Sequence, residues 1–193
     1  KKDIPRTADL DVKLKTLTSP FLKMTAIYNY VRSNMEWNGA SSIWALDGVK
    51  SAWKDKKGTA GEINLILINL LKDAGINVTP LLVSTKDNGL VNTWLADYNQ
   101  FDRVMAYVNI DDEIYILDAT DKATPSYLFP LSVMATEGML IAKPDNYEWG
   151  WHTLWDGTHL FERTVVLNAT ADSLGNLKGS AQITAKDYER CKL

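Results

Sequence analysis

KGTAGEINLILINLLKDAGI, at residues 57–76, carries the strongest local folding signal in the chain. Thr59 and Glu62 have the spacing of a capping box, in which the threonine hydroxyl accepts from the Glu62 amide and the Glu62 carboxylate accepts from the Thr59 amide. The pattern predicts a helix that begins at Ala60, and Gly75 is the expected left-handed residue at its end. Because the helix carries its own apolar residues around nearly its whole circumference, we expect it to be central in the fold.

Two helices are expected before this stretch. Ser19-Pro20 opens an amphipathic helix whose apolar residues recur at helical spacing and which we expect to end near residues 37–39. Residues 46–53 are typical of a short second helix.

The pattern after residue 77 changes from helical spacing to strands. Strands are expected at residues 78–84, 103–110 and 113–117, with a turn at Asp111-Asp112 and a long loop at residues 85–100. Residues 160–171 and 177–188 predict a β-hairpin. Helices followed by an antiparallel sheet define an α+β domain, here with a C-terminal β-hairpin extension.

Bulk composition limits the kinds of protein and partner. A length of 193 residues and 46% hydrophobic content suit one packed domain at residues 1–145, with its core at about 20–142, and an extension at residues 146–193. The net charge of −3, without a Lys/Arg run, argues against nucleic acid, and no apolar stretch reaches the ~20 residues needed to cross a bilayer. Cys191 is the single cysteine, which excludes an intramolecular disulfide. Since the chain begins without methionine, we expect a segment of a longer protein.

Three motifs in order carry a family resemblance. The segment at residues 57–76 is followed by Phe101-Asp102-Arg103-Val104 and by Leu117-Asp118-Ala119-Thr120. This order resembles the transglutaminase-like branch of the papain-type cysteine enzymes, with Phe-Asp-Arg-Val in place of the family's Phe-Asn-His-Val. The resemblance implies papain-like helices packed on an antiparallel sheet, and it places a Cys-His-Asp triad on Ala60, Arg103 and Asp118.

Further matches are similar to the exported Bacteroidetes-type proteins in which a transglutaminase-like domain lies between β-sandwich domains. They occur at residues 63–65, 81–86 and 117–121. The resemblance implies a periplasmic or cell-surface location, neighbouring β-sandwich domains of the same chain as partners, and a hairpin that begins the following β domain.

The residues at the triad positions argue against catalysis. Alanine has no nucleophile and arginine does not release a proton near neutral pH, so we expect a pseudoenzyme that binds or scaffolds. Arg103 is expected to form a bidentate pair with Asp118, and the cleft near Ala60 would suit an anionic group such as a peptide carboxylate. Two alternatives stay open: an active amidase, peptidase or transglutaminase with substitute residues, and a purely structural spacer.

Other residues are candidates for binding a peptide or a glycan. Exposed indoles offer a stacking platform, although aromatic residues in alternating strands also suit packing. No cofactor is expected, and His152 and His159 lack the spacing of a metal site. The candidate binding residues are Thr59, Asp102, Trp94, Trp149 and Trp151.

Overall fold

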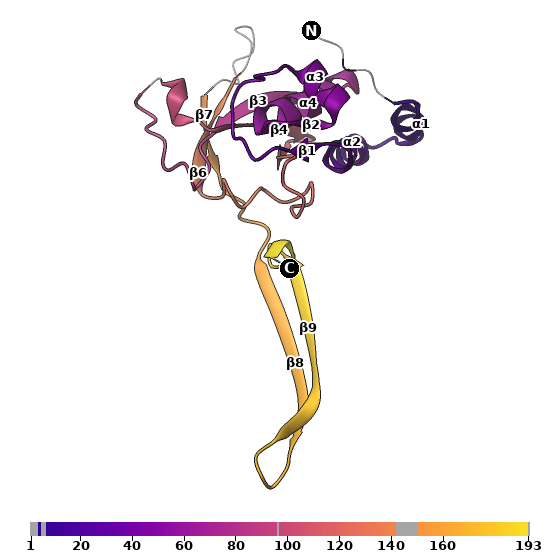
Figure 1. Ribbon diagram of the computed structural model, residues 1–193, viewed down its shortest axis with the longest axis vertical. Coiled ribbons are helices and arrows are strands. Elements are labelled where there is room, and N and C mark those ends of the chain that lie inside the picture. Colours follow the sequence, from indigo (N-terminus) through magenta and orange to yellow (C-terminus); the bar gives the residue numbers. More distant parts are fainter. Residues whose placement is uncertain (1–3, 5–6, 96, 142–149, 193) are drawn as a thin grey trace. The chain divides into compact units, whose positions relative to one another are not determined.

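The computed structural model describes residues 4, 7–95, 97–141 and 150–192 and divides the chain into two compact units, Lys1–Trp155 and Asp156–Leu193 (Figure 1). The first unit combines helices with an antiparallel sheet, and the second contains a β-hairpin. The expected α+β class with a C-terminal hairpin is confirmed.

Helix α4 (Ala60–Asp73) lies at the centre of the first unit. Both hydrogen bonds of the expected capping box are present at Thr59 and Glu62, and Gly75 has the left-handed φ of 77° that ends the helix. Its first residues and both of its faces are buried, and it contacts two other helices and the sheet. The other α-helices of the described residues are α1 (Ala8–Thr16), α2 (Pro20–Asn34) and α3 (Val49–Asp55).

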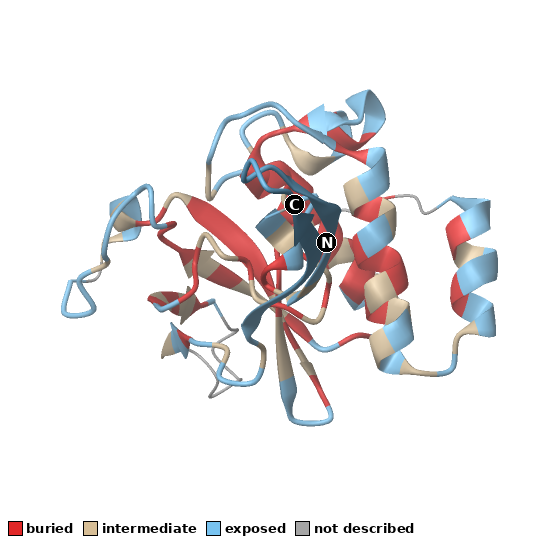
Figure 2. Cartoon of the chain, turned by 90° about the horizontal axis from the view of Figure 1, so that it is seen from below, coloured by how far each residue is buried: buried red, intermediate tan, exposed pale blue. Residues whose placement is uncertain are grey.

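The sheet has the strand order β5-β4-β3-β6-β7, and every neighbouring pair is antiparallel. Along β4, Val104, Ala106 and Val108 join the core that includes α2 and α4, whereas Met105 joins a second cluster on the opposite face. The sheet therefore has buried residues on both faces, and Figure 2 colours much of its centre red. The strands are β3 (Val78–Val83), β4 (Arg103–Ile110), β5 (Glu113–Leu117), β6 (Thr136–Leu140) and β7 (Gly150–Leu154).

Several predicted boundaries in the N-terminal half are wrong. Helix α2 ends at Asn34 rather than near residues 37–39, because Glu36–Trp37 forms strand β1 and pairs in parallel with strand β2 (Lys57–Gly58). Helix α3 begins at Val49 rather than at residue 46. Helix α1 and the strands β6 and β7 were not predicted. In α1 only Leu10 and Leu14 are buried, so its periodic signal is weak.

The second unit contains the predicted hairpin. Strand β8 (Phe161–Ala171) pairs with β9 (Leu177–Asp187) over eleven residues, and a short helix, η2 (Arg190–Lys192), follows. The sequence placed a boundary at residues 145–146, but β7 pairs with β6 and so belongs to the sheet of the first unit. Whether the hairpin begins a further β domain stays a prediction.

Asp156 links the two ends of this hairpin. Its carboxylate accepts from the Tyr188 hydroxyl at 2.6 Å, from His159 Nδ1 at 2.8 Å and from the amides of Thr158 and His159. Burial alone would raise the pKa of Asp156, but these hydrogen bonds outweigh burial and lower the pKa below the usual value of 3.8. The ionised carboxylate therefore stabilises the hairpin.

We expect the second unit to lose stability as the pH falls from 3.8 through the lowered pKa of Asp156, and to keep that stability above pH 3.8. Amide hydrogen exchange along β8 and β9 between pH 6 and pH 2 measures this dependence. Asp156→Asn should remove most of it, whereas Asp172→Asn, in the exposed hairpin turn, should remove less. An equal pH dependence in the wild type and in Asp156→Asn would contradict the expectation.

Candidate functional site

The three triad-like positions lie on separate elements that meet at the start of α4. Ala60 is the first residue of α4, Arg103 is the first residue of β4, and Asp118 follows the last residue of β5. Arg103 Nη1 contacts Asp118 Oδ2 at 2.7 Å, which confirms the expected ion pair. The loop before α3 joins the positions, since Ala40 O accepts from the Ala60 amide and Ser41 Oγ accepts from Arg103 Nη2.

The ion pair is not bidentate, which corrects the prediction. Nη1 alone contacts the carboxylate, Nη2 donates to Ser41 at 3.2 Å, and Nε is buried without a partner. The other carboxylate oxygen, Oδ1, already accepts from the Asn64 side chain at 3.0 Å and from the amide and hydroxyl of Thr120 at 2.9 and 2.6 Å. Because those donors occupy Oδ1, a second guanidinium bond has no acceptor there.

Asn64 is the site residue that sequence reasoning missed. It lies one turn after Ala60 and is fully buried. Its amide nitrogen donates to Val104 O and to Asp118, and its amide oxygen accepts from the Ala119 amide at 2.8 Å. The available signal was a polar residue among apolar neighbours in a helix expected to be central, because a buried amide needs hydrogen-bond partners.

The start of α4 is covered by a loop rather than open. Ala60 is fully buried, and a Cβ added to Gly61 would lie 2.6 Å from Ser42 O and 2.7 Å from Trp44 O. Real Cβ atoms do not approach backbone oxygen so closely, so glycine at position 61 allows the loop to lie directly on the helix. A ligand therefore has no open approach to Ala60.

Glu62 occupies the place at the helix N-terminus where an external anion would bind. Its buried carboxylate accepts from the Thr59 amide at 3.0 Å and from the amides of Asp47 and Gly48 at 2.7 and 3.0 Å. At the start of α4 the Thr59 amide donates to this carboxylate, the Ala60 amide donates to Ala40 O and the Glu62 amide donates to Thr59 Oγ1, so these donors already have acceptors. The bonds from Glu62 to Asp47 and Gly48 hold residues 47–48 outside helix α3, which explains its late start.

The arrangement offers no nucleophile of the expected kind. Ala60 has no reactive group, and Arg103 holds a permanent positive charge where an imidazole would exchange a proton. The Thr59 hydroxyl does donate to Glu62 Oε2 at 3.3 Å, but both side chains are buried and serve the helix cap.

The other candidate residues are dispersed. Asp102 accepts from the amide and hydroxyl of Thr85 and so fastens the base of the loop at residues 85–100. Trp94 is 97% exposed on that loop. Trp151 packs against the Phe101 ring, with centroids 5.8 Å apart, and Trp149 lies outside the described residues.

A pair of aromatic residues that was not predicted lies beside the covered site. The Trp44 ring, from the loop that covers α4, meets the Tyr98 ring, from the loop that carries Trp94, edge-on at 5.9 Å. Both are 58% exposed. The two loops therefore meet through aromatic side chains that still face solvent.

Metal ligands and membrane spans are not found in the part of the chain that the structure describes. There, no three His, Cys, Asp or Glu side chains are grouped so that they could hold a metal ion. None of the described helices combines the length and apolar character of a membrane span.

Comparison with known proteins shows a distant likeness to a solved structure. No family model and no curated protein matches the chain. Among solved structures, the crystal structure of a "putative protease" from Parabacteroides distasonis is similar at 19% sequence identity, with a TM-score of 0.46. The match covers 61% of this chain and 26% of that one, so the chain corresponds to about a quarter of its length.

Proposed function

We propose that the chain is a catalytically inactive transglutaminase-like domain that acts as a scaffolding and binding module within a larger exported protein, in the periplasm or at the cell surface. One observation carries the proposal: a buried Arg103–Asp118 pair stands where a catalytic His-Asp pair would need to exchange protons. Family resemblance supplies the transglutaminase-like assignment and the location.

The closed site favours scaffolding over binding in the former cleft. Ala60, Asn64 and Asp118 are fully buried and satisfied by the chain itself. We therefore propose that a peptide or a glycan binds at the exposed aromatic residues Trp44, Trp94 and Tyr98, and their accessible faces support this proposal. The alternative is a purely structural spacer that binds no ligand, and the closed site is compatible with this alternative as well.

The hairpin supports a role beside other β-sheets. Most residues on one face of β8 and β9 are apolar and exposed, although Arg163 and Asp187 also lie on that face. An isolated two-stranded hairpin is only marginally stable in water. A neighbouring β-sandwich domain of the same protein would cover this face. The large apolar residues of the face are Phe161, Val165, Leu167, Leu177 and Ile183.

Amide hydrolysis and amine incorporation by the purified chain test the absence of catalysis. We expect neither activity above a heat-denatured control. Activity that Thr59→Ala or Asp118→Ala abolishes, in a variant that still folds, would instead establish an enzyme with substitute residues.

Thiol labelling tests whether the site is closed. In a Cys191→Ser background, Ala60→Cys should react with a soluble disulfide reagent at least about 100-fold more slowly than the exposed control Ser51→Cys, which corresponds to an opening free energy of roughly 2.8 kcal/mol. An unchanged melting temperature would show that the new thiol fits. Equal labelling rates would mean that the cleft is open and would return the binding proposal to Ala60.

A further inference from the structure

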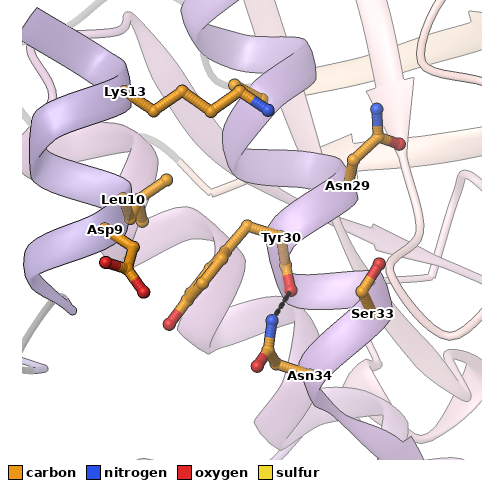
Figure 3. A pocket seen from close by; sticks show the side chains of 8 residues that line it. Asp9, Leu10, Lys13, Asn29, Tyr30, Ser33 and Asn34 are labelled. Carbon is orange, nitrogen blue, oxygen red and sulfur yellow. Dashed lines mark hydrogen bonds between the residues drawn. The ribbon is translucent and has the colours of Figure 1, made fainter.

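Two adjoining cavities lie along helix α2, and neither is lined by Ala60, Arg103 or Asp118. The first, about 270 Å³, lies between α1 and α2, and its lining includes Lys13 from α1 and Asn29 and Ser33 from α2 (Figure 3). The second, about 360 Å³, is lined by the same Asn29 and Ser33 together with Arg32 and Lys122. The shared residues make the two cavities neighbouring parts of one groove, which we call the α2 groove.

Arg32 and Lys122 hold each other in place in the second cavity. Arg32 Nη2 donates to the carbonyl oxygen of Lys122, and Lys122 Nζ donates to the carbonyl oxygens of Arg32 and Met35. The guanidinium also lies over the Tyr28 ring, 4.9 Å from its centroid. Because both side chains are already ordered, a ligand would not need to immobilise them.

No carboxylate balances this pair of cations. Among the described residues, neither Arg32 nor Lys122 forms an ion pair. Burial, and next the charge of Arg32, lower the pKa of Lys122 from its usual 10.5. Asp121 precedes Lys122, but its carboxylate turns to the amides of Ala123 and Thr124 and to the Thr124 hydroxyl. The carbonyl groups at the end of α2 offset only about half a charge.

We propose that the α2 groove binds a small organic anion whose phosphate or carboxylate group lies between Arg32 and Lys122. Asn29 and Ser33 add neutral hydrogen-bonding groups to the same cavity. The body of the ligand extends into the first cavity, over Leu10 and Ala26. The groove as a whole is cationic, because Lys13, Arg32 and Lys122 outnumber Asp9.

Titration of the isotope-labelled chain with inorganic phosphate, and separately with acetate, tests the site by NMR, with chloride keeping the ionic strength constant. We expect saturable shifts at Asn29, Ser33 and Lys122, with a dissociation constant on the order of 1 mM for the better anion, and a rise in the pKa of Lys122 as the anion binds. The anion with the lower dissociation constant, phosphate or acetate, identifies the charged group of the ligand. Shifts that fail to saturate, or that chloride alone reproduces, would overturn the proposal.

Variants separate the site from general charge effects. Lys122→Gln should weaken phosphate or acetate binding at least about tenfold, whereas Lys54→Gln, on the exposed side of α3, should leave it unchanged. Unchanged binding by Lys122→Gln would count against the site.

Asn29→Asp tests the same idea without removing a cation. Asn29 Oδ1 lies 3.5 Å from Arg32 Nη1, so the isosteric carboxylate would take the place of the bound anion. We expect a higher melting temperature and loss of phosphate binding, with no such change in Asn168→Asp on the exposed hairpin. A lower melting temperature or unaltered phosphate binding in Asn29→Asp would overturn the proposal, and this variant stays informative if Lys122→Gln does not fold.

Discussion

Asp118→Ala is expected to lower the free energy of unfolding by about 3–5 kcal/mol, the loss found when one partner of a buried ion pair is removed. The variant would leave the Arg103 guanidinium without its anion, and the buried side chains of Asn64 and Thr120 without their shared acceptor. Since a domain of this size has a total free energy of unfolding of about 5–15 kcal/mol, the expected loss is a large fraction of its stability. Urea denaturation followed by tryptophan fluorescence measures the change.

Two further variants identify the cause of this loss. Asp87→Ala, on the exposed loop at residues 85–100, should change stability by less than about 0.5 kcal/mol. Arg103→Met combined with Asp118→Ala should recover part of the loss, because no unpaired buried charge remains. A loss below about 1 kcal/mol for Asp118→Ala would mean that solvent reaches Arg103 and that the site is more open than its burial indicates.

Glu62→Ala is expected to cost about 2–4 kcal/mol, because the amides of Asp47, Gly48 and Thr59 would lose their acceptor together. The helix would also lose its capping box. Hydrogen exchange should accelerate first at Asp47 and Gly48, since their amides depend on the Glu62 carboxylate.

Glu113→Ala, on an exposed residue of β5, is the matched control and should have little effect on stability. Glu62→Gln should cost less than Glu62→Ala, because its remaining oxygen can still accept from two of the amides. Exchange rates at Asp47 and Gly48 that do not change in Glu62→Ala would contradict the role assigned to this carboxylate.

The elements that were predicted correctly are those whose signals are local. The capping box and Gly75 define α4 within seventeen residues of chain, and the Asp111-Asp112 turn, with positive φ at both residues, sets the β4–β5 hairpin. The missed elements depend on distant partners. Strands β1 and β2 contain two residues each, and their paired residues are more than twenty positions apart in the sequence. No periodic pattern therefore predicts them.

For the candidate site, the ion pair was predicted correctly but its geometry was not. The Arg103–Asp118 pair follows from two neighbouring strands, and it is present. Its single-point geometry depends on Asn64, which lies 54 residues before Asp118 in the sequence. No pattern within α4 indicates which oxygen of that carboxylate Asn64 would occupy, and therefore the bidentate form was predicted wrongly.

Residue identity was enough to exclude a thiol nucleophile at Ala60 and a proton-transferring imidazole at Arg103, because those chemistries belong to the side chains themselves. Folding in three dimensions brings Ala40 and Ser41 onto Ala60 and Arg103, closes the start of α4, and sets Lys122 beside Arg32. These contacts join segments far apart in the chain. They depend on the packing of α2, α4 and the sheet, which no local pattern contains.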